Sequence, residues 1–159
     1  MGYVENIRKK VGHVPLILNG SCVIMSNPRG QILLQKRNEK KQRWGLPGGL
    51  MELGESTGET IIREVFEETG ILLSSDRLQF FGLVSGADYF TTADNGDEYY
   101  VVSCCYQVDQ VTETPQIADG ESLEFAWFDL DKLPGNYPVS QGEFIKRYTK
   151  KMLDNSSNS

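Results

Sequence analysis

Apolar and polar positions along the chain predict a sheet that lies between two layers of helices. Short apolar runs with the composition of strands cover residues 14–26, 30–37, 79–86, 98–109 and 122–129. In the fourth run, one face alternates apolar side chains at Tyr100, Val102, Cys104, Tyr106 and Val108. The other face of that run is also largely apolar, and a strand apolar on both faces is covered on both sides.

Residues 57–69 have the periodicity of an amphipathic helix. One face of this helix is apolar and is expected to belong to the core, through Ile61, Ile62, Val65 and Phe66. Ser56 and Glu59 have the spacing of a capping box at its start, and Gly70 is suited to end it. This is the helix that the sequence defines best.

Two other helices and one turn complete the predicted elements. A helix is expected at 141–153 with Ser140 as its N-cap, and a short one near residues 3–10. Residues 27–30, with the sequence Asn-Pro-Arg-Gly, predict a turn that joins the first two strands as a hairpin. Strands and helices mixed in this way define an α/β fold.

The length and composition fit one domain. The chain has 159 residues, of which 39% are hydrophobic and 24% charged, and domains typically run to about 100–150 residues. We expect a single domain over residues 1–153 and a disordered polar tail over 154–159.

The acidity of the chain is concentrated in one segment. The formal net charge is −6, which argues against long nucleic acid as a partner because such binding needs a basic face. Residues 49–71 contain six Glu and one Arg, a net of −5, and the remaining residues contribute only −1. The charge is therefore a local feature that needs a local reason.

The compartment is predicted from what the sequence lacks. Cys22, Cys104 and Cys105 have no metal-ligand or disulfide spacing, and buried small apolar side chains are the simpler interpretation. The first residues lack the apolar stretch of a signal peptide, and no run approaches the ~20 apolar residues of a membrane span. We expect a cytoplasmic protein with no membrane partner.

The helix at 57–69 carries three carboxylates on one face. Glu64, Glu67 and Glu68 stand at i, i+3 and i+4, where each like-charge pair costs about 0.2–0.5 kcal/mol. A divalent cation would reverse the sign of this cost, because hard cations bind carboxylate oxygens. Taken alone, the pattern also fits a solvated acidic face.

The segment before the helix favours the cation site over the solvated acidic face. Trp44-Gly-Leu-Pro-Gly-Gly49 brings two consecutive glycines to the approach, where the backbone can lie close to a metal or a phosphate. The fixed positions of residues 49–71 are Gly49, Glu55, Arg63, Glu64, Val65, Glu67, Glu68, Gly70 and Ile71. This string resembles the Nudix box at every defined position.

The resemblance implies the Nudix fold, a mixed sheet sandwiched between helices, and Mg²⁺- or Mn²⁺-assisted hydrolysis of a nucleoside diphosphate linked to another group, X. It implies that three carboxylates face the metal, namely Glu64, Glu67 and Glu68. The carbonyl of Gly48 or Gly49 would complete the metal shell, and Glu55 with Arg63 would form the orienting pair.

The position of the general base stays open between two glutamates. Family members place this base either in the box or on a loop, so Glu64 is the first choice and Glu121 the second. By resemblance, the loop 118–122 could also supply Glu121 as a further metal ligand, although a surface glutamate explains it equally well.

Two residues outside the box are candidates for substrate binding. Arg37 is preferred over Lys36 and Arg43 as a partner of substrate phosphates. Tyr89 lies at a plausible distance from the box for the tyrosine of the diadenosine-polyphosphate type. Phe90, Tyr99 and Tyr100 could also stack a base, although packing is the commoner role of such residues.

The substrate class follows only coarsely from the resemblance. Signatures of the coenzyme A, NADH and ADP-ribose types are not evident, which leaves a nucleoside triphosphate, as in MutT-like proteins, as the leading expectation. Dinucleoside polyphosphates, ADP-ribose and nucleotide sugars remain alternatives. A catalytically silent domain that binds a nucleotide as a sensor is an alternative of another class. Nudix enzymes are often homodimers.

Overall fold

The computed structural model describes residues 2–118 and 120–157, which form three α-helices, two 3₁₀ helices and eight strands. The helices are α1 (Tyr3–Val11), α2 (Thr57–Thr69) and α3 (Val139–Ser157), with η1 (Ser75–Arg77) and η2 (Ala87–Tyr89) as the short turns. The strands are β1 (Leu16–Met25), β2 (Ile32–Arg37), β3 (Trp44–Gly45), β4 (Gly48–Leu50), β5 (Gln79–Val84), β6 (Phe90–Thr92), β7 (Glu98–Val108) and β8 (Ser122–Phe128).

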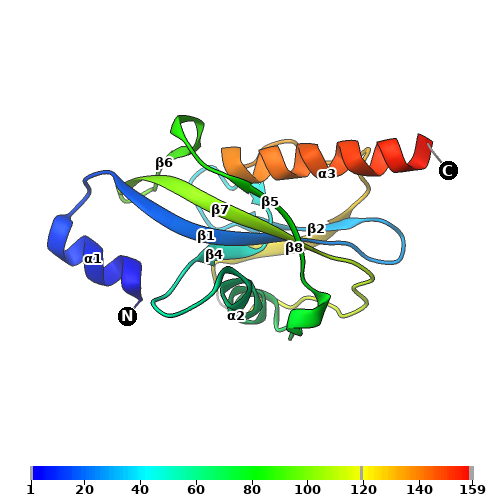
Figure 1. Cartoon of the computed structure of the whole chain (residues 1–159), viewed down its shortest axis with the longest axis horizontal. Helices are drawn as coiled ribbons and strands as arrows, with labels where there is room; N and C mark the ends of the chain where they lie inside the picture. Colours follow the sequence, from blue (N-terminus) through cyan, green and yellow to red (C-terminus); the bar gives the residue numbers. More distant parts are fainter. Residues whose placement is uncertain (1, 119, 158–159) are drawn as a thin grey trace.

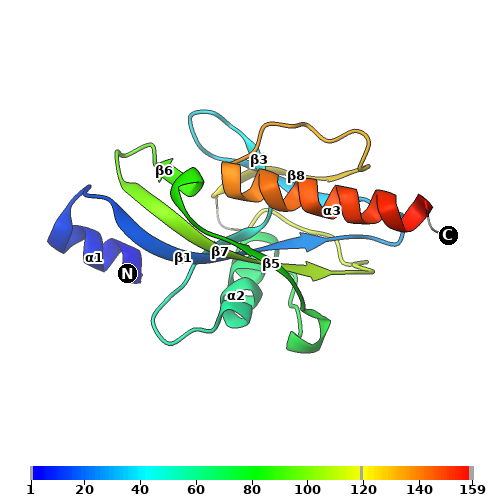
Figure 2. The same ribbon diagram turned by 45° about the horizontal axis from the view of Figure 1, so that its top comes forward.

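The strands form two sheets instead of one. The larger sheet has the order β4-β1-β7-β5, with β6 also paired to β7, and β1 runs parallel to β7 from Leu16↔Tyr99 to Met25↔Val108. The smaller sheet has the order β3-β2-β8, and all its pairings are antiparallel. Helices α2 and α3 lie on opposite sides of the strands (Figures 1 and 2). The predicted α/β sandwich is confirmed.

Strands apolar on both faces supply two separate cores. On the side of α3, one cluster is built from Cys22, Ile24, Ile32, Leu34, Leu46, Val84, Cys105, Phe144, Ile145 and Tyr148. On the side of α2, the other is built from Val23, Met25, Leu33, Ile61, Val65, Ile71, Leu73, Val108 and Val111. Successive residues of β1 and β2 thus alternate between the clusters, as the twofold periodicity of a strand requires.

Helix α2 begins and ends where the sequence predicts. Glu59 N–H donates to Ser56 Oγ at 3.0 Å and Ser56 N–H donates to Glu59 Oε1 at 3.4 Å, which completes the capping box. Gly70 adopts φ 77° and its N–H donates to the carbonyl of Phe66, which closes the last turn. Ile61 and Val65 are fully buried, but Phe66 is 52% exposed, so its predicted place in the core is wrong.

The predicted turn is present, but the predicted hairpin is reduced to one antiparallel bridge. Gly30 N–H donates to the carbonyl of Asn27 at 2.9 Å and closes the turn. Only one bridge, Ser26↔Ile32, joins the two strands next to it. Beyond this bridge β1 enters the larger sheet and β2 the smaller one. The strands diverge because each finds a longer partner elsewhere, β7 for β1 and β8 for β2.

Helix α3 is longer at both ends than the sequence predicts. It begins at Val139, so Ser140 lies inside the helix and is not its N-cap. It continues to Ser157, so the segment 154–157 is helical where a disordered tail was expected, and residues 158–159 lie outside the described residues. No glycine or proline interrupts this end, and Ser157 Oγ donates to the carbonyl of Leu153 at 3.1 Å.

The cysteines are free thiols, as expected from their spacing. Cys22 and Cys105 are buried as predicted, whereas Cys104 is only half-buried, and burial raises the pKa of the Cys105 thiol above its usual range. No helix among residues 2–118 and 120–157 is both long enough and apolar enough to cross a bilayer.

The capping box gives the first testable prediction. Replacing Ser56 with Ala should lower the free energy of unfolding by about 1 kcal/mol, because an amide at the start of α2 loses its acceptor. Urea unfolding measures this loss. Ser85→Ala, at an exposed position between β5 and η2, serves as the control and should change stability by less than about 0.5 kcal/mol. Equal losses in the two variants would contradict a specific capping role.

Candidate active site

A cleft of about 820 Å³ lies between the two sheets. Its walls come from β1, β4, β6 and β7 of the larger sheet and from β2 of the smaller one, together with the three α-helices and the loop before β8. Eight of the site candidates named from the sequence line it, namely Arg37, Arg43, Gly48, Gly49, Glu64, Glu68, Tyr99 and Glu121. The cleft is large enough for a nucleotide, since ligand sites typically measure about 300–1,000 Å³.

The glycine-rich segment passes from one sheet to the other at this cleft. It forms β3 at Trp44–Gly45 and β4 at Gly48–Leu50, and the carbonyl of Pro47 between them accepts from Val23 N–H at 3.0 Å. A side chain at Gly48 would overlap the carbonyl oxygen of Ser21, and one at Gly49 would overlap the Glu64 carboxylate. Gly48 therefore requires glycine, because a side chain there would meet the backbone, and Gly49 lets the Glu64 carboxylate lie directly against the backbone.

The guanidinium of Arg63 joins the box residues into one network. Its Nε donates to Glu55 Oε2 at 2.6 Å and its Nη2 donates to Glu55 Oε1 at 3.0 Å, in a two-point contact. Its Nη2 also donates to the carbonyl of Leu50 at 3.1 Å. Arg63 is the main cause that lowers the pKa of Glu55 to about 2. The contact that the resemblance implies between Glu55 and Arg63 is thus present, and the hydrogen bond from Arg63 to Leu50 links α2 to β4.

The three carboxylates of α2 occupy different environments. Glu68 is 1% exposed, and its Oε1 accepts from Gly48 N–H at 3.1 Å. Glu64 lies against Gly49 and accepts from Arg63 Nη1 at 2.8 Å, and burial raises the pKa of its carboxyl. Glu67 is turned toward Arg63 at 3.3 Å, and its side chain is 52% exposed. Only Glu64 and Glu68 line the cleft.

Within residues 2–118 and 120–157, no three acidic, thiol or imidazole side chains are grouped so as to hold a metal ion directly. The guanidinium of Arg63 accounts for this, because it holds Glu64 and Glu67 on one nitrogen. The residues nevertheless fit a divalent cation. Two desolvated carboxylates face the cleft beside glycines whose missing side chains leave room for the Glu64 carboxylate, and carboxylate oxygens are the ligands of Mg²⁺ and Mn²⁺.

The candidates outside the box have mixed outcomes. Glu121 lines the same cleft as Glu64, and its carbonyl accepts from Asn38 N–H at 3.0 Å; Asp119 of that loop lies outside the described residues. Arg37 also lines the cleft. Tyr89 does not join them: it lies in η2 and packs against the core cluster on the side of α3. We therefore withdraw its proposed role in substrate binding.

A second polar network at the cleft was not predicted. Glu39 accepts from Arg37 Nε at 2.7 Å and from Arg43 Nε at 2.6 Å. Burial alone would raise the pKa of Glu39, but the hydrogen bonds from Arg43 and Arg37 hold it at about 2. Tyr99 lines the cleft with these three residues. The sequence shows the charges in the run 36–43, but not that β7 brings a tyrosine beside them.

The fold and this cleft together define a class: an α/β sandwich with a carboxylate-bearing helix beside a glycine-rich strand. A family model described as the NUDIX domain matches residues 18–148. The chain belongs to the Nudix family.

Similar proteins support the same assignment. The chain is 32% identical over 114 residues to human "Nucleoside diphosphate-linked moiety X motif 6", which covers 70% of this chain and 34% of the human protein. It is 28% identical over 119 residues to "ADP-ribose pyrophosphatase" of Methanocaldococcus jannaschii, covering 75% of this chain and 64% of that protein. The chain thus spans about a third to two thirds of the length of these relatives.

A solved structure with the same fold is that of a MutT NUDIX hydrolase from Burkholderia pseudomallei. It superposes with a TM-score of 0.68 at 26% sequence identity, and the match covers 82% of this chain and 97% of that chain. The fold deduced from the box therefore extends over most of the chain.

The Glu55–Arg63 pair predicts a pH dependence of stability. The pKa of Glu55 is about 2 in the folded protein, against an ordinary value of 4.5, so its stabilising contribution is present above pH 4.5 and is lost as the pH falls toward 2. Glu55→Gln removes this contribution. The fall in the free energy of unfolding between pH 6 and pH 2.5 should therefore be smaller in the variant than in the wild type.

Chemical denaturation at a series of pH values measures this difference. Glu124→Gln is the control, because it removes an exposed carboxyl from β8 without touching Arg63, and it should follow the wild-type curve. An unchanged pH dependence in Glu55→Gln would show that the pair does not stabilise the fold.

Proposed function

We propose that this protein is a metal-dependent pyrophosphohydrolase that cleaves a nucleoside diphosphate linked to X. One observation carries the proposal: the cleft contains two desolvated carboxylates, Glu64 and Glu68, beside glycines that leave the backbone open to a ligand. Helix stability alone does not favour such a pair, since like charges one turn apart repel. Membership of the Nudix family supports the same reaction class.

Mg²⁺ or Mn²⁺ is the proposed cofactor. Glu64 and Glu68 would hold it from the cleft wall, with the carbonyl of Gly48 and the carboxylate of Glu121 as further ligands that line the cleft. Glu67 does not line the cleft and would join them by turning from Arg63 toward the cation. When bound, the cation supplies the positive charge that hydrolysis of a phosphoanhydride requires. Arg63 would have two functions in this site. It offsets the negative charge of the carboxylates, and its fixed contact with Glu55 sets where the α2 carboxylates lie.

The attacking water must lose a proton to a carboxylate. Glu64 remains the first candidate, because burial raises the pKa of its carboxyl and so makes it a stronger base than an exposed glutamate. Glu121 is the second candidate, since it lines the same cleft from the loop before β8. Substituting each in turn separates the two, because only loss of the base should abolish the rise of kcat with pH.

The cleft can also accommodate the rest of a nucleotide. Arg37 and Arg43 border it at the end formed by β2, where their charges would attract phosphates of the substrate. Tyr99 lines the same end, and its ring, in place of that of Tyr89, is our candidate for stacking against the base of the nucleotide. A nucleoside triphosphate is our leading substrate, with dinucleoside polyphosphates, ADP-ribose and nucleotide sugars as alternatives; ADP-ribose gains support from the name of the archaeal relative.

A turnover assay tests the reaction class. Phosphate or nucleotide release is measured from deoxynucleoside triphosphates, dinucleoside polyphosphates, ADP-ribose and nucleotide sugars, with Mg²⁺ and with Mn²⁺. We expect metal-dependent turnover of at least one substrate, and a loss of roughly 100-fold or more in kcat for Glu67→Gln, as for removal of a group that stabilises transition-state charge.

Glu59→Gln is the matched control. It removes one charge from the same helix, at an exposed position of the first turn, and should retain most of the activity. Turnover that is equal in Glu67→Gln and the wild type would exclude Glu67 as a metal ligand. Binding of a nucleotide without any turnover would instead favour a nucleotide sensor.

Metal binding should also be visible without substrate. At a free Mg²⁺ concentration ten times its dissociation constant, binding to the folded state adds about 1.4 kcal/mol of stability, which raises Tm by about 3–5 °C in a domain of this size. Differential scanning calorimetry measures the shift. Glu68→Gln should lose it and Glu59→Gln should keep it. An equal Mg²⁺ shift in both variants would place the cation elsewhere on the protein.

A further inference from the structure

Helix α1 is bound to the rest of the protein mainly through its ends. None of its residues is buried. At its C-terminal end, Arg8 donates to the carbonyls of Val14 and Glu98, each at 2.6 Å. His13, just beyond the helix, contacts Asp97 at 2.7 Å. These polar contacts hold α1 beside the start of β7, at the margin of the molecule (Figure 1).

The N-terminal end of α1 is held by a residue of the Nudix box. The N-cap residue Gly2 has no side chain to accept from the first amides of the helix, which are unpaired in any helix. Glu52, in the segment between β4 and α2, supplies the missing acceptor: its Oε2 accepts from Tyr3 N–H at 2.8 Å. A carboxylate at this place also interacts favourably with the helix dipole.

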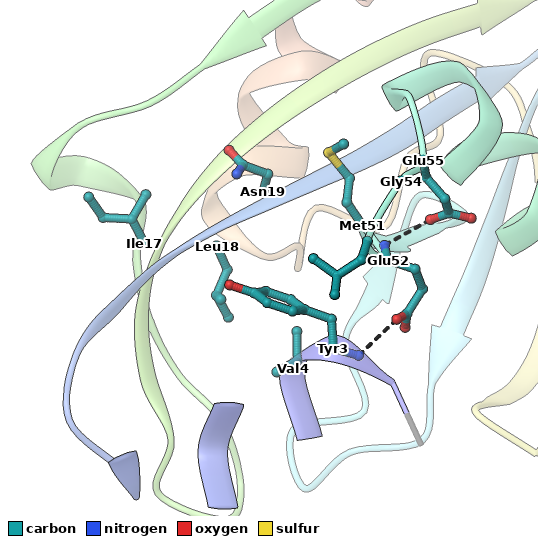
Figure 3. Close-up of a pocket in the computed structure, with 10 residues that line it drawn as sticks. Tyr3, Val4, Ile17, Leu18, Asn19, Met51, Glu52, Gly54 and Glu55 are labelled. Carbon is teal, nitrogen blue, oxygen red and sulfur yellow. Dashed lines mark hydrogen bonds between the residues drawn. The ribbon is translucent and has the colours of Figure 1, made fainter. Parts of the chain in front are cut away.

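The backbone of Glu52 makes a second contact, in the direction of the active site. Its N–H donates to Glu55 Oε1 at 2.8 Å, so the same residue binds α1 with its side chain and Glu55 with its main chain (Figure 3). Glu55 in turn receives two hydrogen bonds from Arg63, which also binds Glu64 and Glu67. A continuous chain of hydrogen bonds therefore runs from α1 to the carboxylates of α2.

Little apolar packing supports this end of α1. A pocket of about 260 Å³ lies beneath the helix, between Tyr3 and Val4 on one side and Leu18 and Met51 on the other (Figure 3). Contacts with few buried apolar groups open at low free energy, so the hydrogen bond between Tyr3 and Glu52 is important for keeping the N-terminal end of α1 docked, while Arg8 holds its C-terminal end. Val4 and Glu52 also line the main cleft, so docking of α1 shapes the mouth of that cleft.

We propose that Glu52 is a positioning residue, which couples docking of α1 to the orientation of the Glu55–Arg63 pair and thereby to the carboxylates of the cleft. The proposal rests on the proposed function, because the pair matters for catalysis only if the cleft hydrolyses a substrate. Undocking of α1 releases the Glu52 segment, and Glu55 then loses one of the donors that fix it. Thr60 and Arg63 still donate to Glu55, so the pair persists but its carboxylate is fixed less tightly.

Tyr3→Pro tests the coupling at one atom. Proline is favoured at the first position of a helix and lacks only the N–H that Glu52 accepts. Gly2 before it has φ −77° and ψ 169°, an extended conformation that a following proline permits. Tyr3→Ala is the matched control, because it removes the same ring and keeps the N–H. The assay uses whichever nucleotide of the panel above has the highest turnover.

The expected result is a difference between these two variants. We expect kcat of Tyr3→Pro to be roughly 3- to 10-fold below that of Tyr3→Ala, with KM changed less than about twofold. This is at the lower edge of the loss of activity caused by mutating residues that hydrogen-bond to metal ligands. Glu52→Ala should lower kcat to a similar extent, and the double variant Tyr3→Pro/Glu52→Ala should be no worse than Glu52→Ala alone, because both remove one interaction. Equal kcat values in Tyr3→Pro and Tyr3→Ala would overturn the proposal.

A measurement without metal or substrate separates this proposal from the reaction itself. Amide hydrogen exchange of residues 52–55 should be roughly tenfold faster in Tyr3→Pro than in Tyr3→Ala, since the Glu52 N–H loses its fixed acceptor geometry. A wild type without turnover in the panel would refute the proposed function, while faster exchange would still establish the coupling. Identical exchange in the two variants would refute the coupling, whatever the activity.

Discussion

The guanidinium of Arg63 is the contact on which the site depends. It is the positive charge that α2 offers to three glutamates of the box, and it distributes its donors among Glu55, Glu64 and Glu67. Without it, carboxylates at helical spacing would repel one another and turn toward solvent. Arg63 Nη2 binds both Glu55 and the carbonyl of Leu50. The same guanidinium therefore offsets the negative charge of the carboxylates and fixes α2 to β4.

The glycines of β4 allow the strand to lie close enough to α2 for the Arg63 contacts to form. Gly48 and Gly49 bring β4 close to both β1 and α2, so that a buried carboxylate, Glu68, can accept a hydrogen bond from the strand while Glu64 lies against the backbone. The same crossing from β3 to β4 connects the two sheets. The cleft is therefore bounded by main chain and by side chains whose own partners fix them, as is required of a site that must hold small charged groups in place.

Much of this could be predicted from the sequence, for identifiable reasons. The capping box and Gly70 depend on local spacing, the Glu55–Arg63 contact was implied by the resemblance to the Nudix box, and strands apolar on both faces required two covering layers. The predictions that were wrong depended on which strands pair across long distances in the sequence. Partners for β1 and β2 lie far along the chain, so a turn that looks like a hairpin instead separates two sheets. Phe66 follows the apolar period of α2 yet is 52% exposed, because the period alone does not show how much of a helix face is covered. That Tyr99 and not Tyr89 lines the cleft depends on the position of β7, which the sequence does not show.

The single bridge between Ser26 and Ile32 makes the two sheets diverge from a common point. The cleft-lining parts of β1 and β2, near Cys22 and Arg37, lie about four or five residues from that point, or roughly 15 Å at about 3.3 Å per residue. At that radius, a rotation of about 5° between the sheets changes the gape of the cleft by about 1 Å, which is the scale of misplacement that impairs catalysis. A substitution near the bridge that rotated one sheet against the other would therefore change the width of the cleft without contacting its lining.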